Sequence, residues 1–591
     1  MDRLVGELHS TMLRCGYRYL TSKQLKVYPH LSDISNNHKV YIKEFETLEG
    51  TFSIALIFTH DPYTSLPIAY ILNKPKHLEN VLLAHVNSGW YLCYVEEREA
   101  DWNPNDLFEI YVTVDSQIQH TLNNSIESLR NNQLELTELE GEFSAYWKPE
   151  LVIYCLSNFT SINYKTVSLT TNKSNSNSEL KETVLYYNTE VENYKNWSTQ
   201  RNLEEFDIKK LHVFLVKVRP KRLSGIHWPP QNSTQFFEWL TIVDHNAKAQ
   251  LVKYFLTNNY KHHLILLEVE KQDTIGLILE LNQEAVQLNS YANANKIAKK
   301  GRKIKLDRVS SVLAGKNAFN KFQRVSFIKA DKETIISRNR SRPEIGNLSE
   351  KRIALIGCGT IGGYVSELLI RSGGGIENGH LHLYDYDTYG PQNFGRHTLN
   401  THDFGKNKAL ALKERLASST HLKTNIKSFK IDFLLEPEIL AKYDLIIDAT
   451  GRPPISKRLA FLLRKITQPN KPIIIHGFND GNGLASKVFI DYLDGCYNCL
   501  CSDNKFFENG NDKRFNDLLE VNAKRVSCGN TYTPYDASVS VITAALVQEA
   551  CLSTLETSRN WNYKEHLFLG GRTSKPKLIT SKPFCDICNA K

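Results

Sequence analysis

The chain has 591 residues, 41% of them hydrophobic, which is more than one hydrophobic core usually serves. Its formal net charge of +9, from 73 basic and 64 acidic residues, is a modest excess that requires no direct contact with nucleic acid. The N-terminus lacks the apolar run of a signal peptide, and no apolar stretch approaches the ~18 residues that a membrane span needs. We therefore expect an α/β multidomain protein of the cytoplasm with no membrane contact.

Residues 1–120 combine helical and strand patterns and are expected to form an α+β domain. The runs TFSIALIF (residues 51–58) and FEIYVTV (residues 108–114) are rich in β-branched and aromatic residues, so both predict strands. A helix is expected after the second run.

Cys93 is the first candidate nucleophile. It lies in HVNSGWYLCYVEEREADWNP, among turn formers and polar groups, and cytoplasmic thiols stay reduced. The aromatic neighbours Trp90, Tyr91 and Tyr94 would also suit a packed structural thiol, so that alternative stays open.

Residues 121–337 predict a middle domain of mixed structure without a chemical motif. TTNKSNSNSELKE (residues 170–182) has the composition of a flexible loop. The basic run KIAKKGRKIK (residues 296–305) could contact phosphates, but a solvated linker or helix face explains it more simply.

From residue 338 to 591, strand-like runs alternate with helical stretches, as in a Rossmann-like fold with a parallel-rich sheet. IALIGCGTIGG places Gly357, Gly359 and Gly362 between a strand and a helix, the context in which GxGxxG binds phosphate. Asp385 ends the next strand, where an acidic residue binds ribose hydroxyls. These residues alone fit an oxidoreductase as well as a nucleotide-binding module.

Cysteines give this region two further predictions. Two CxxC pairs, Cys496 with Cys499 and Cys585 with Cys588, indicate a tetrahedral Zn²⁺ site; a redox motif or plain packing is the alternative. Cys528, in RVSCGNTYTPYDAS, precedes a helical stretch whose N-terminus would lower the pKa of the thiol. The alternative is a buried cysteine ahead of a core helix.

The segment DYDTYGPQNFGRHTLNTHDFGKNKALAL resembles the adenylyltransferase family of ThiF, MoeB and the ubiquitin-activating enzymes. The resemblance implies ATP as substrate and Mg²⁺ as cofactor, with charge on the α-phosphorus stabilised by fixed cations. By position it gives the ribose to Asp385, the phosphates to Asn393 and Arg396, and the α-phosphate to Lys408.

Four further implications come from the same resemblance. One of Arg338, Arg340 and Arg342 would reach ATP across a homodimer. Gly451 stands where the family commonly has an aspartate, which leaves Asp448 as the candidate at the magnesium site. The CxxC pairs resemble the zinc site of the family, and Cys528 would take the activated carboxyl group as a thioester.

The N-terminal region resembles the ubiquitin-conjugating fold. The order is a strand, a YPxxP-like turn in HDPYTSLP, HVN at residues 85–87, Cys93, and Trp102-Asn103-Pro104. The resemblance makes Cys93 the second thioester carrier and Asn87 the amide that supports the oxyanion. Val86 replaces the usual proline, which puts the local turn geometry in doubt.

Together, the two regions resemble the fused activating and conjugating enzymes of bacterial antiphage CBASS operons. The resemblance implies a homodimer that adenylates the C-terminus of a cyclic-oligonucleotide synthase (CD-NTase). The acyl group would pass from Cys528 to Cys93 and then to lysine amines of acceptor proteins, priming antiviral signalling. The alternatives are a ThiF/MoeB-type sulfur-carrier adenylyltransferase, a Rossmann oxidoreductase and a nucleotide-binding scaffold; Cys93 with WNP argues against the first.

Overall fold

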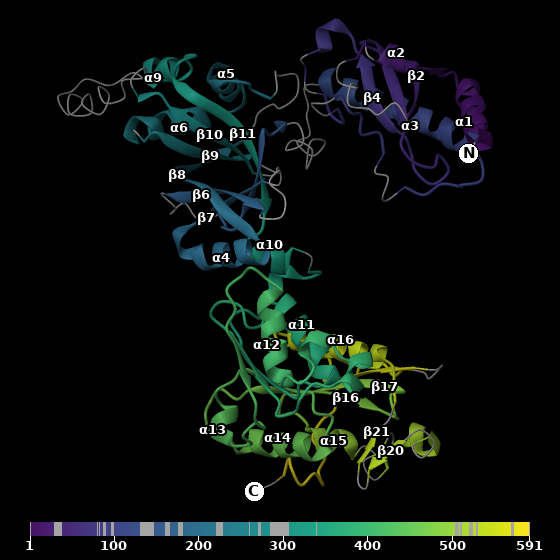
Figure 1. Cartoon of the computed structure of the whole chain (residues 1–591), viewed down its shortest axis with the longest axis vertical. Coiled ribbons are helices and arrows are strands. Elements are labelled where there is room, and N and C mark those ends of the chain that lie inside the picture. The colour runs from purple at the N-terminus through teal and green to yellow at the C-terminus, as the bar shows by residue number, and fades with distance from the viewer. Residues whose placement is uncertain are drawn as a thin grey trace, which may run out of the picture.

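The structure is a computed structural model of the whole chain (Figure 1). It describes residues 2–25, 27–28, 38–79, 81, 83–86, 90–95, 100–130, 147–159, 166–174, 181–219, 229–258, 260–269, 274–283, 306–338, 340–502, 507–508, 511–518, 524–527, 530–532, 534–568 and 573–589. No helix among these residues is both long and apolar enough to cross a bilayer.

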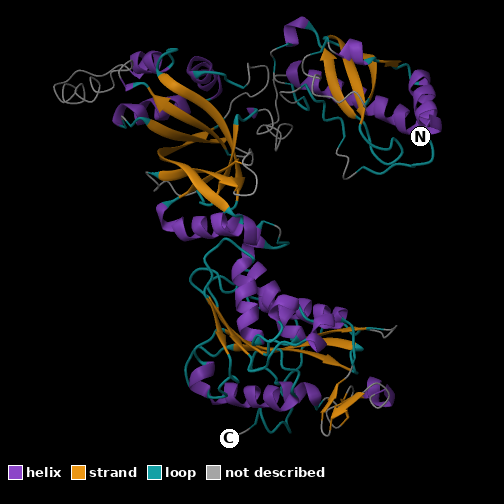
Figure 2. Ribbon diagram, viewed as in Figure 1, coloured by secondary structure: helices purple, strands orange, loops and turns teal. Residues whose placement is uncertain are grey.

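The N-terminal region is a four-stranded antiparallel sheet with helices packed against it (Figure 2). Its strands follow the order β1-β2-β3-β4, and the apolar run at residues 51–58 lies in β3, as predicted. The elements are α1 (Asp2–Arg14), β1 (Arg18–Tyr19), α2 (Ser22–Leu25), β2 (Lys39–Thr47), β3 (Gly50–Phe58), β4 (Ile68–Asn73), η2 (Lys76–Leu78) and α3 (Leu107–Arg130).

The predicted strand at residues 108–114 is wrong, because this run opens the long helix α3. Ile110, Tyr111, Val114 and Ile118 are buried at helical spacing, so one apolar stripe faces the sheet. Leu122 and Ile126 continue the stripe past residue 120, and the helix ends at Arg130. Helical periodicity therefore outweighs the strand propensity of the individual residues.

The middle region is a closed barrel of seven strands in the order β10-β11-β5-β7-β6-β8-β9. Three neighbouring pairs, β11 with β5, β5 with β7, and β8 with β9, run parallel. The elements are β5 (Leu151–Cys155), β6 (Val167–Ser174), β7 (Lys181–Tyr186), η4 (Asn188–Glu190), α4 (Val191–Gln200), β8 (Leu203–Val218), α5 (Ser233–Val243), α6 (His245–Thr257), β9 (His262–Val269), β10 (Ile275–Leu281), α9 (Leu306–Leu313) and β11 (Phe319–Lys329).

Three apolar clusters hold the barrel, and the smallest packs α4 against β7 and β8. The other two are larger. One contains residues of the strands, including Ile153, Leu264 and Val325, and the other joins the sheet to α5, α6 and α9. The loop predicted at residues 170–182 is corrected at both ends: residues 170–174 belong to β6 and residues 181–182 begin β7. The basic run at residues 296–305 lies outside the described residues.

The barrel joins the C-terminal region through α4. The Asn193 Oδ1 atom accepts a hydrogen bond from the backbone N–H of Lys423 (2.8 Å), and the Gln200 amide donates to the carbonyl of Thr420 (2.8 Å). On the other side, His421 donates to the carbonyl of Ala330 (2.8 Å) and burial lowers its pKa.

The C-terminal region is built on a seven-stranded sheet in the order β14-β13-β12-β15-β16-β17-β22. The first five strands are parallel, and β17 and β22 are antiparallel to their neighbours. Helices cover both faces: α11, α12 and α16 on one, α13 and α14 on the other (Figure 2). The predicted Rossmann-like α/β fold is confirmed.

The elements of this region are α10 (Lys332–Ser337), η5 (Pro343–Ile345), β12 (Arg352–Ile356), α11 (Thr360–Arg371), β13 (His380–Tyr384), η6 (Pro391–Arg396), η7 (Thr401–Asp403), α12 (Lys408–Ser418), β14 (Ile426–Phe429), α13 (Pro437–Leu440), β15 (Leu445–Asp448), α14 (Pro453–Lys465), β16 (Ile473–Asp480), β17 (Ala485–Asp491), α15 (Tyr497–Cys501), β18 (Phe507–Glu508), β19 (Asn511–Asp512), η8 (Lys513–Leu518), β20 (Lys524–Ser527), β21 (Asn530–Tyr532), α16 (Ala537–Ser553) and β22 (Tyr563–Leu567). The carboxyl ends of β12, β13 and β15 meet at one edge, where open α/β sheets bind ligands.

Candidate active site

The glycine-rich turn after β12 is shaped by close backbone contacts. Gly357 has φ +88°, and a Cβ at Gly362 would lie 1.9 Å from the carbonyl oxygen of Gly357. Gly359 has nothing within 4 Å of its Cβ position, so its outer side is open. Two glycines therefore make the turn possible, and the third leaves room for a ligand at the N-terminus of α11.

Asp385 and Lys408 lie on opposite sides of the turn that follows β13. The carboxylate of Asp385 accepts hydrogen bonds from the backbone N–H groups of Cys358 (2.7 Å) and Asp387 (2.8 Å), while burial raises its pKa. Lys408 is almost fully buried and pairs with Asp387, whose pKa this contact keeps below its usual value. The Asn407 amide donates to the carbonyls of Asp385 and Asp387. The turn is thus fixed before any ligand binds.

These residues border a cavity of about 400 Å³. Gly357, Gly359, Asp385 and Lys408, all predicted from the sequence, line it. Residues that the sequence did not single out complete the wall: Asp432, Phe433, Leu435, Thr450, Arg452 and Ile455. The position of these residues just beyond β14 and β15, at the ligand edge of the sheet, was the signal that could have identified them.

Asp448 lies beneath this cavity and does not line it. It is 2% exposed, and its two oxygens accept hydrogen bonds from Thr450 (2.6 Å), Ser456 (2.5 Å) and the His476 ring (2.9 Å). The hydrogen bond from His476 helps to keep the pKa of Asp448 below its usual value despite the burial. In this geometry Asp448 fixes the turn at residues 449–452. Its expected place at a magnesium ion stays a prediction.

Asn393 and Arg396 lie on η6, beside the same edge. The Asn393 side chain accepts a hydrogen bond from the backbone N–H of Gly390 (3.2 Å). The guanidinium group of Arg396 stands over the ring of Tyr535, 4.8 Å from its centroid. Both side chains are half-buried, and neither lines the cavity.

A buried histidine connects η6 to the glycine-rich turn. His397 donates from Nε2 to the carbonyl of Cys358 (2.9 Å), because its Nδ1 already accepts the backbone N–H of Leu399 (3.1 Å). Burial lowers the pKa of His397 to about 4, so the ring is neutral at neutral pH.

The three arginines ahead of β12 have different surroundings. Arg342 pairs with Glu556 (2.7 Å), and Arg338 lines a cleft that residues 326–329 of β11 also border. The Nη1 atom of Arg340 is buried and has no hydrogen-bond partner among the described residues. Of the three, Arg340 thus keeps a donor available for a group outside the described chain.

In the N-terminal region, Cys93 is half-buried and held by its backbone. Its N–H donates to the carbonyl of His85 (2.8 Å), and the preceding Leu92 donates to Ala69 (2.9 Å) on β4. His85, the first residue of the HVN sequence, and Trp90 both have positive φ, 61° and 65°, so the chain turns at both residues. The position predicted for Asn87 lies outside the described residues.

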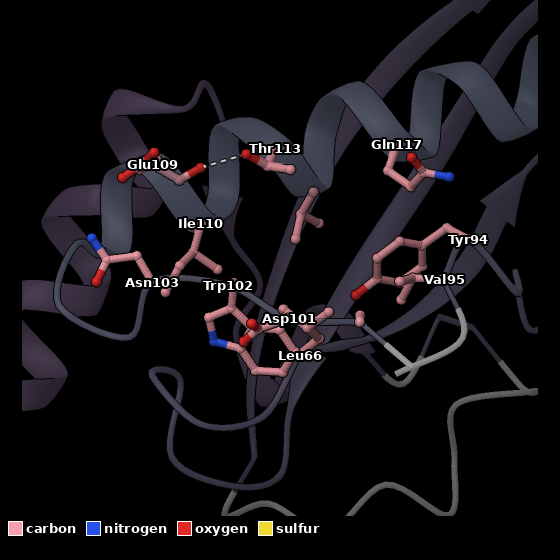
Figure 3. Close-up of a pocket in the computed structure, with 12 residues that line it drawn as sticks. Leu66, Tyr94, Val95, Asp101, Trp102, Asn103, Glu109, Ile110, Thr113 and Gln117 are labelled. Carbon is pink, nitrogen blue, oxygen red and sulfur yellow. Dashed lines mark hydrogen bonds between the residues drawn. The ribbon is translucent and has the colours of Figure 1, made fainter. Parts of the chain in front are cut away.

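Three aromatic side chains donate hydrogen bonds to the proline-rich turn at residues 60–67. Trp102 donates to the carbonyl of Tyr63 (2.8 Å), Tyr111 donates to Pro62 (2.9 Å), and Tyr94 donates to Pro67 (2.7 Å). A cavity of about 300 Å³ lies beside them, between α3 and the segment of Trp102 (Figure 3). The WNP segment, the turn and the chain next to Cys93 therefore form one packed unit.

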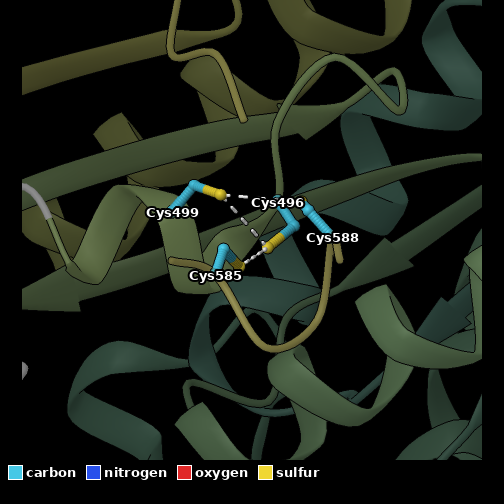
Figure 4. A group of neighbouring side chains, drawn as sticks. All are labelled: Cys496, Cys499, Cys585 and Cys588. Atoms are coloured by element: carbon cyan, nitrogen blue, oxygen red, sulfur yellow. Dashed lines mark hydrogen bonds between the residues drawn. The ribbon is translucent and has the colours of Figure 1, made fainter. Parts of the chain in front are cut away.

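The four predicted metal ligands come together beyond the end of β17, where α15 meets the C-terminal segment (Figure 4). Their sulfur atoms lie within 4.8 Å of one another, and neighbouring pairs are 3.5 to 3.7 Å apart. Four sulfurs at about 2.3 Å around a tetrahedral zinc would be roughly 3.8 Å apart, so this arrangement fits the ion. A hydrogen bond from Cys496 lowers the pKa of Cys499.

Cys528, the predicted first nucleophile, lies outside the described residues. The described chain on either side of it is the short hairpin of β20 and β21, and the chain resumes at residue 534 ahead of α16.

Comparisons with known proteins match both regions. Residues 15–153 match the model of prokaryotic E2 family B, and residues 334–581 match the ThiF family. The chain is 43% identical over 585 residues to the ATP-dependent ubiquitin transferase-like protein Cap2 of Vibrio cholerae, and the match covers 99% of both chains. It is also 43% identical over 594 residues to the protein of the same name from Escherichia coli, again over 99% of each. The prediction of an E2-like region ahead of a ThiF-like region is confirmed.

Among solved structures, the chain is similar to E. coli MccB. The match to one MccB crystal structure has a TM-score of 0.33 and 19% identity, and covers 44% of this chain and 73% of MccB. The match to MccB with ATP has a TM-score of 0.31 and 18% identity, and covers 42% and 70%.

Proposed function

This chain belongs to the family of the ATP-dependent ubiquitin transferase-like protein Cap2, and from that premise we propose that it joins the C-terminus of a donor protein to amines through two thioesters. It is an ATP-dependent adenylating and transferase enzyme. The observation that carries the proposal is the pairing of a nucleotide-type cavity in the C-terminal region with a backbone-held, half-buried cysteine in the E2-like region.

The first step is adenylation. A carboxylate oxygen of the donor attacks the α-phosphorus of ATP, an acyl phosphate bond forms, and pyrophosphate leaves. Asp385 binds the ribose, because its carboxylate ends β13 at the wall of the cavity and keeps lone pairs for hydroxyl groups. Lys408 supplies a fixed cation to the α-phosphate, and Asn393 and Arg396 contact the phosphates from η6.

The acyl group then moves between thiols. The thiolate of Cys528 attacks the acyl carbon and AMP leaves; the thiolate of Cys93 attacks that thioester and frees Cys528. An acceptor lysine finally attacks the thioester on Cys93, forming an amide and releasing the thiol. Asn87 supports the oxyanion of this last step.

Two metal ions belong to the proposal. Mg²⁺ would neutralise the leaving pyrophosphate, and among the described residues Asp387 and Asp432 offer carboxylates at the cavity. Zn²⁺ would be held by Cys496, Cys499, Cys585 and Cys588, where it links α15 to the C-terminal segment.

The donor, the acceptor and the assembly follow from the resemblance to CBASS enzymes. The donor is a CD-NTase, a cyclic-oligonucleotide synthase whose conjugation primes antiviral signalling in the cytoplasm. The enzyme acts as a homodimer in which Arg340, whose Nη1 has no described partner, contacts ATP bound by the second copy.

The order of the two thioesters tests the mechanism. With ATP and the donor, Cys93→Ala should accumulate a reductant-sensitive adduct on Cys528 and yield no stable conjugate. Cys528→Ala should still form the adenylate but load neither cysteine. Cys501→Ser, which alters a half-buried thiol outside the four-cysteine group, is the matched control and should conjugate normally. Wild-type amounts of reductant-stable conjugate from Cys93→Ala would refute the proposal.

A further inference from the structure

The barrel of the middle region has a polar cavity at one end of its interior. The cavity measures about 490 Å³, and residues of all seven strands line it. Alternate residues of a strand form its walls, such as Lys181 and Thr183 on β7 or Ile278 and Glu280 on β10, as expected for side chains that point into a barrel. A volume of this size is typical of sites that bind small molecules.

The cavity has an apolar floor and an interrupted wall. Leu169, Leu211 and Ile278 line it and also belong to the apolar cluster inside the barrel, so the interior is packed beneath the cavity. In the part of the chain that the structure describes, β5 pairs with β7 only through its last two residues. The first residues of β5 and β7 line the cavity without pairing with each other, so the barrel wall is open beside it.

The acidic side chains of the lining already have basic partners. The three ion pairs are Glu150 with Arg324 (3.4 Å), Glu280 with Lys261 (3.2 Å) and Asp207 with Lys209 (3.2 Å). In the first two pairs the cation comes from outside the lining, and in the third it belongs to the lining. The negative charges of the cavity are therefore balanced without its remaining lysines.

Two lysines of the lining have no such partner. The ammonium groups of Lys181 and Lys321 form no ion pair with any described residue. Lys321 lies opposite Glu280 in the register of β10 and β11, but the Glu280 carboxylate contacts Lys261 instead. Because each acid is matched by another base, these two lysines leave the cavity with an excess of positive charge.

Uncharged polar groups of the lining also lack partners. Thr171 and Thr183 face each other across β6 and β7, and neither hydroxyl group is hydrogen-bonded to another described residue. The Oε1 atom of Gln323 is buried and accepts no hydrogen bond from the described chain. A buried amide oxygen without a donor costs free energy, which a ligand with a hydroxyl group would restore.

We propose that this cavity is a binding site for a small organic dianion that carries a hydroxyl group, such as a phosphate monoester or a hydroxydicarboxylate. Lys181 and Lys321 bind its charged oxygens, and the hydroxyl groups of Thr171 and Thr183 donate hydrogen bonds to them. Gln323 accepts a hydrogen bond from the hydroxyl group of the ligand. The site belongs to the middle region and does not depend on the proposed function.

Calorimetric titration of the full-length protein tests the site. The probes are glycerol 3-phosphate and malate, which represent the two kinds of anion, and glycerol as the neutral control. We expect saturable binding of one or both anions, which identifies the preferred anionic group, and no binding of glycerol. Lys181→Met and Lys321→Met should each weaken binding about tenfold, and Thr183→Val about fivefold. Lys210→Met removes an exposed charge of β8 outside the lining, and this matched control should bind normally.

Gln323→Leu separates binding of a ligand from support of the fold. Leucine removes the unpartnered oxygen, so the ligand-free variant should unfold at the wild-type temperature or above it. Its affinity for the anion should nevertheless fall about fivefold, because the hydroxyl group of the ligand loses its acceptor. A lower unfolding temperature with unchanged affinity would show that Gln323 serves the fold and overturn its place in the site.

The nucleotide cavity is the alternative location for a bound anion. Lys408→Met should leave the affinity for the anion unchanged, and Lys181→Met should leave pyrophosphate exchange unchanged. The inference is overturned if neither anion binds, if Lys210→Met weakens binding as much as Lys181→Met does, or if Lys408→Met abolishes binding while Lys181→Met preserves it. Absence of pyrophosphate exchange in the unmodified enzyme would refute the proposed function and leave the barrel site standing.

Discussion

The two candidate reaction centres are held in place by different means. Around Cys93 the contacts that position the thiol are backbone hydrogen bonds, to His85 and from Leu92 to β4. Around the candidate nucleotide cavity they are hydrogen bonds of polar side chains. Half-buried Asp385 accepts from the glycine-rich turn, half-buried Asn407 donates to the turn after β13, and buried Asp448 accepts from the turn at residues 449–452.

This difference predicts which substitutions change activity without changing the stability of the fold. A site held by backbone atoms keeps its geometry when the reactive side chain is replaced. A site held by buried side chains loses geometry and stability together, because each replacement leaves a partner unsatisfied. Mutations in the two regions should therefore fall into two classes.

The largest expected effect is on Cys93. Cys93→Ala should abolish stable conjugates, yet change the free energy of unfolding by less than about 0.5 kcal/mol, because alanine retains the N–H that bonds to His85. Gel analysis under reducing conditions measures the first quantity and chemical denaturation the second. A marked loss of stability would show that the thiol itself supports the fold.

Lys408 belongs to the second class, in which activity and stability should fall together. Lys408→Met should lower pyrophosphate exchange by about 100-fold, the usual effect of removing one fixed charge from a developing oxyanion. It should also lower stability, since it leaves Asp387 without its cation while the aliphatic stem is preserved. Lys413→Met, a change on the same helix, α12, is the control. Normal exchange in Lys408→Met would remove Lys408 from the proposed site.

Loss of metal from the four-cysteine group should destabilise the C-terminal region. The purified protein is expected to hold about one zinc per chain, and Cys585→Ser should release it and destabilise the C-terminal region on the order of 3 kcal/mol. Metal analysis and thermal unfolding measure both effects, with Cys501→Ser as the control. A stable, zinc-free wild type would contradict the assignment.

The smallest expected effect is a pH dependence from His397. Its pKa of about 4 lies below the ordinary 6.5, so the unfolded chain binds the proton more tightly. Stability is then fully present above about pH 6.5 and is lost as the pH falls toward 4, with roughly 1 kcal/mol gone at pH 5.5. His397→Gln keeps a donor for Cys358 without titrating, and its unfolding temperature should fall less on acidification. Equal slopes for both proteins would exclude His397 as the source.

Much of the lining of the candidate cavity could be predicted, because its residues follow strands in a fixed order. Gly357, Gly359, Asp385 and Lys408 line it, whereas Gly362 belongs to the glycine-rich turn but not to the lining. Arg452 and Phe433 were missed because turns after β15 and β14 carry no motif of their own. The burial of Asp448 could not be predicted, because it depends on His476, a residue of the next strand along the sheet.

The middle region could not be predicted at all. Its closure depends on the parallel pairing of β11 with β5, strands more than 160 residues apart in the chain. No local pattern specifies such a pairing, since register is set by the packing of distant faces. The helix α3 shows the same limit at short range. Its stripe of Ile110, Val114 and Ile118 favours a helix because these residues pack against the sheet, and that packing is not visible in the local sequence.

The contact between α4 of the barrel and the C-terminal region determines which residues there can change in evolution. On the loop after α12 it is made largely of main-chain atoms: the carbonyls of Ala417, Thr420 and His421 and the N–H of Lys423. Main-chain groups survive most substitutions, so positions in that loop other than His421, whose side chain bonds Ala330, can diverge without undocking the barrel. The contacts that depend on side-chain identity come from the amide groups of Asn193, Asn196 and Gln200 on α4. A saturation library at these three positions should yield few variants that keep the barrel docked.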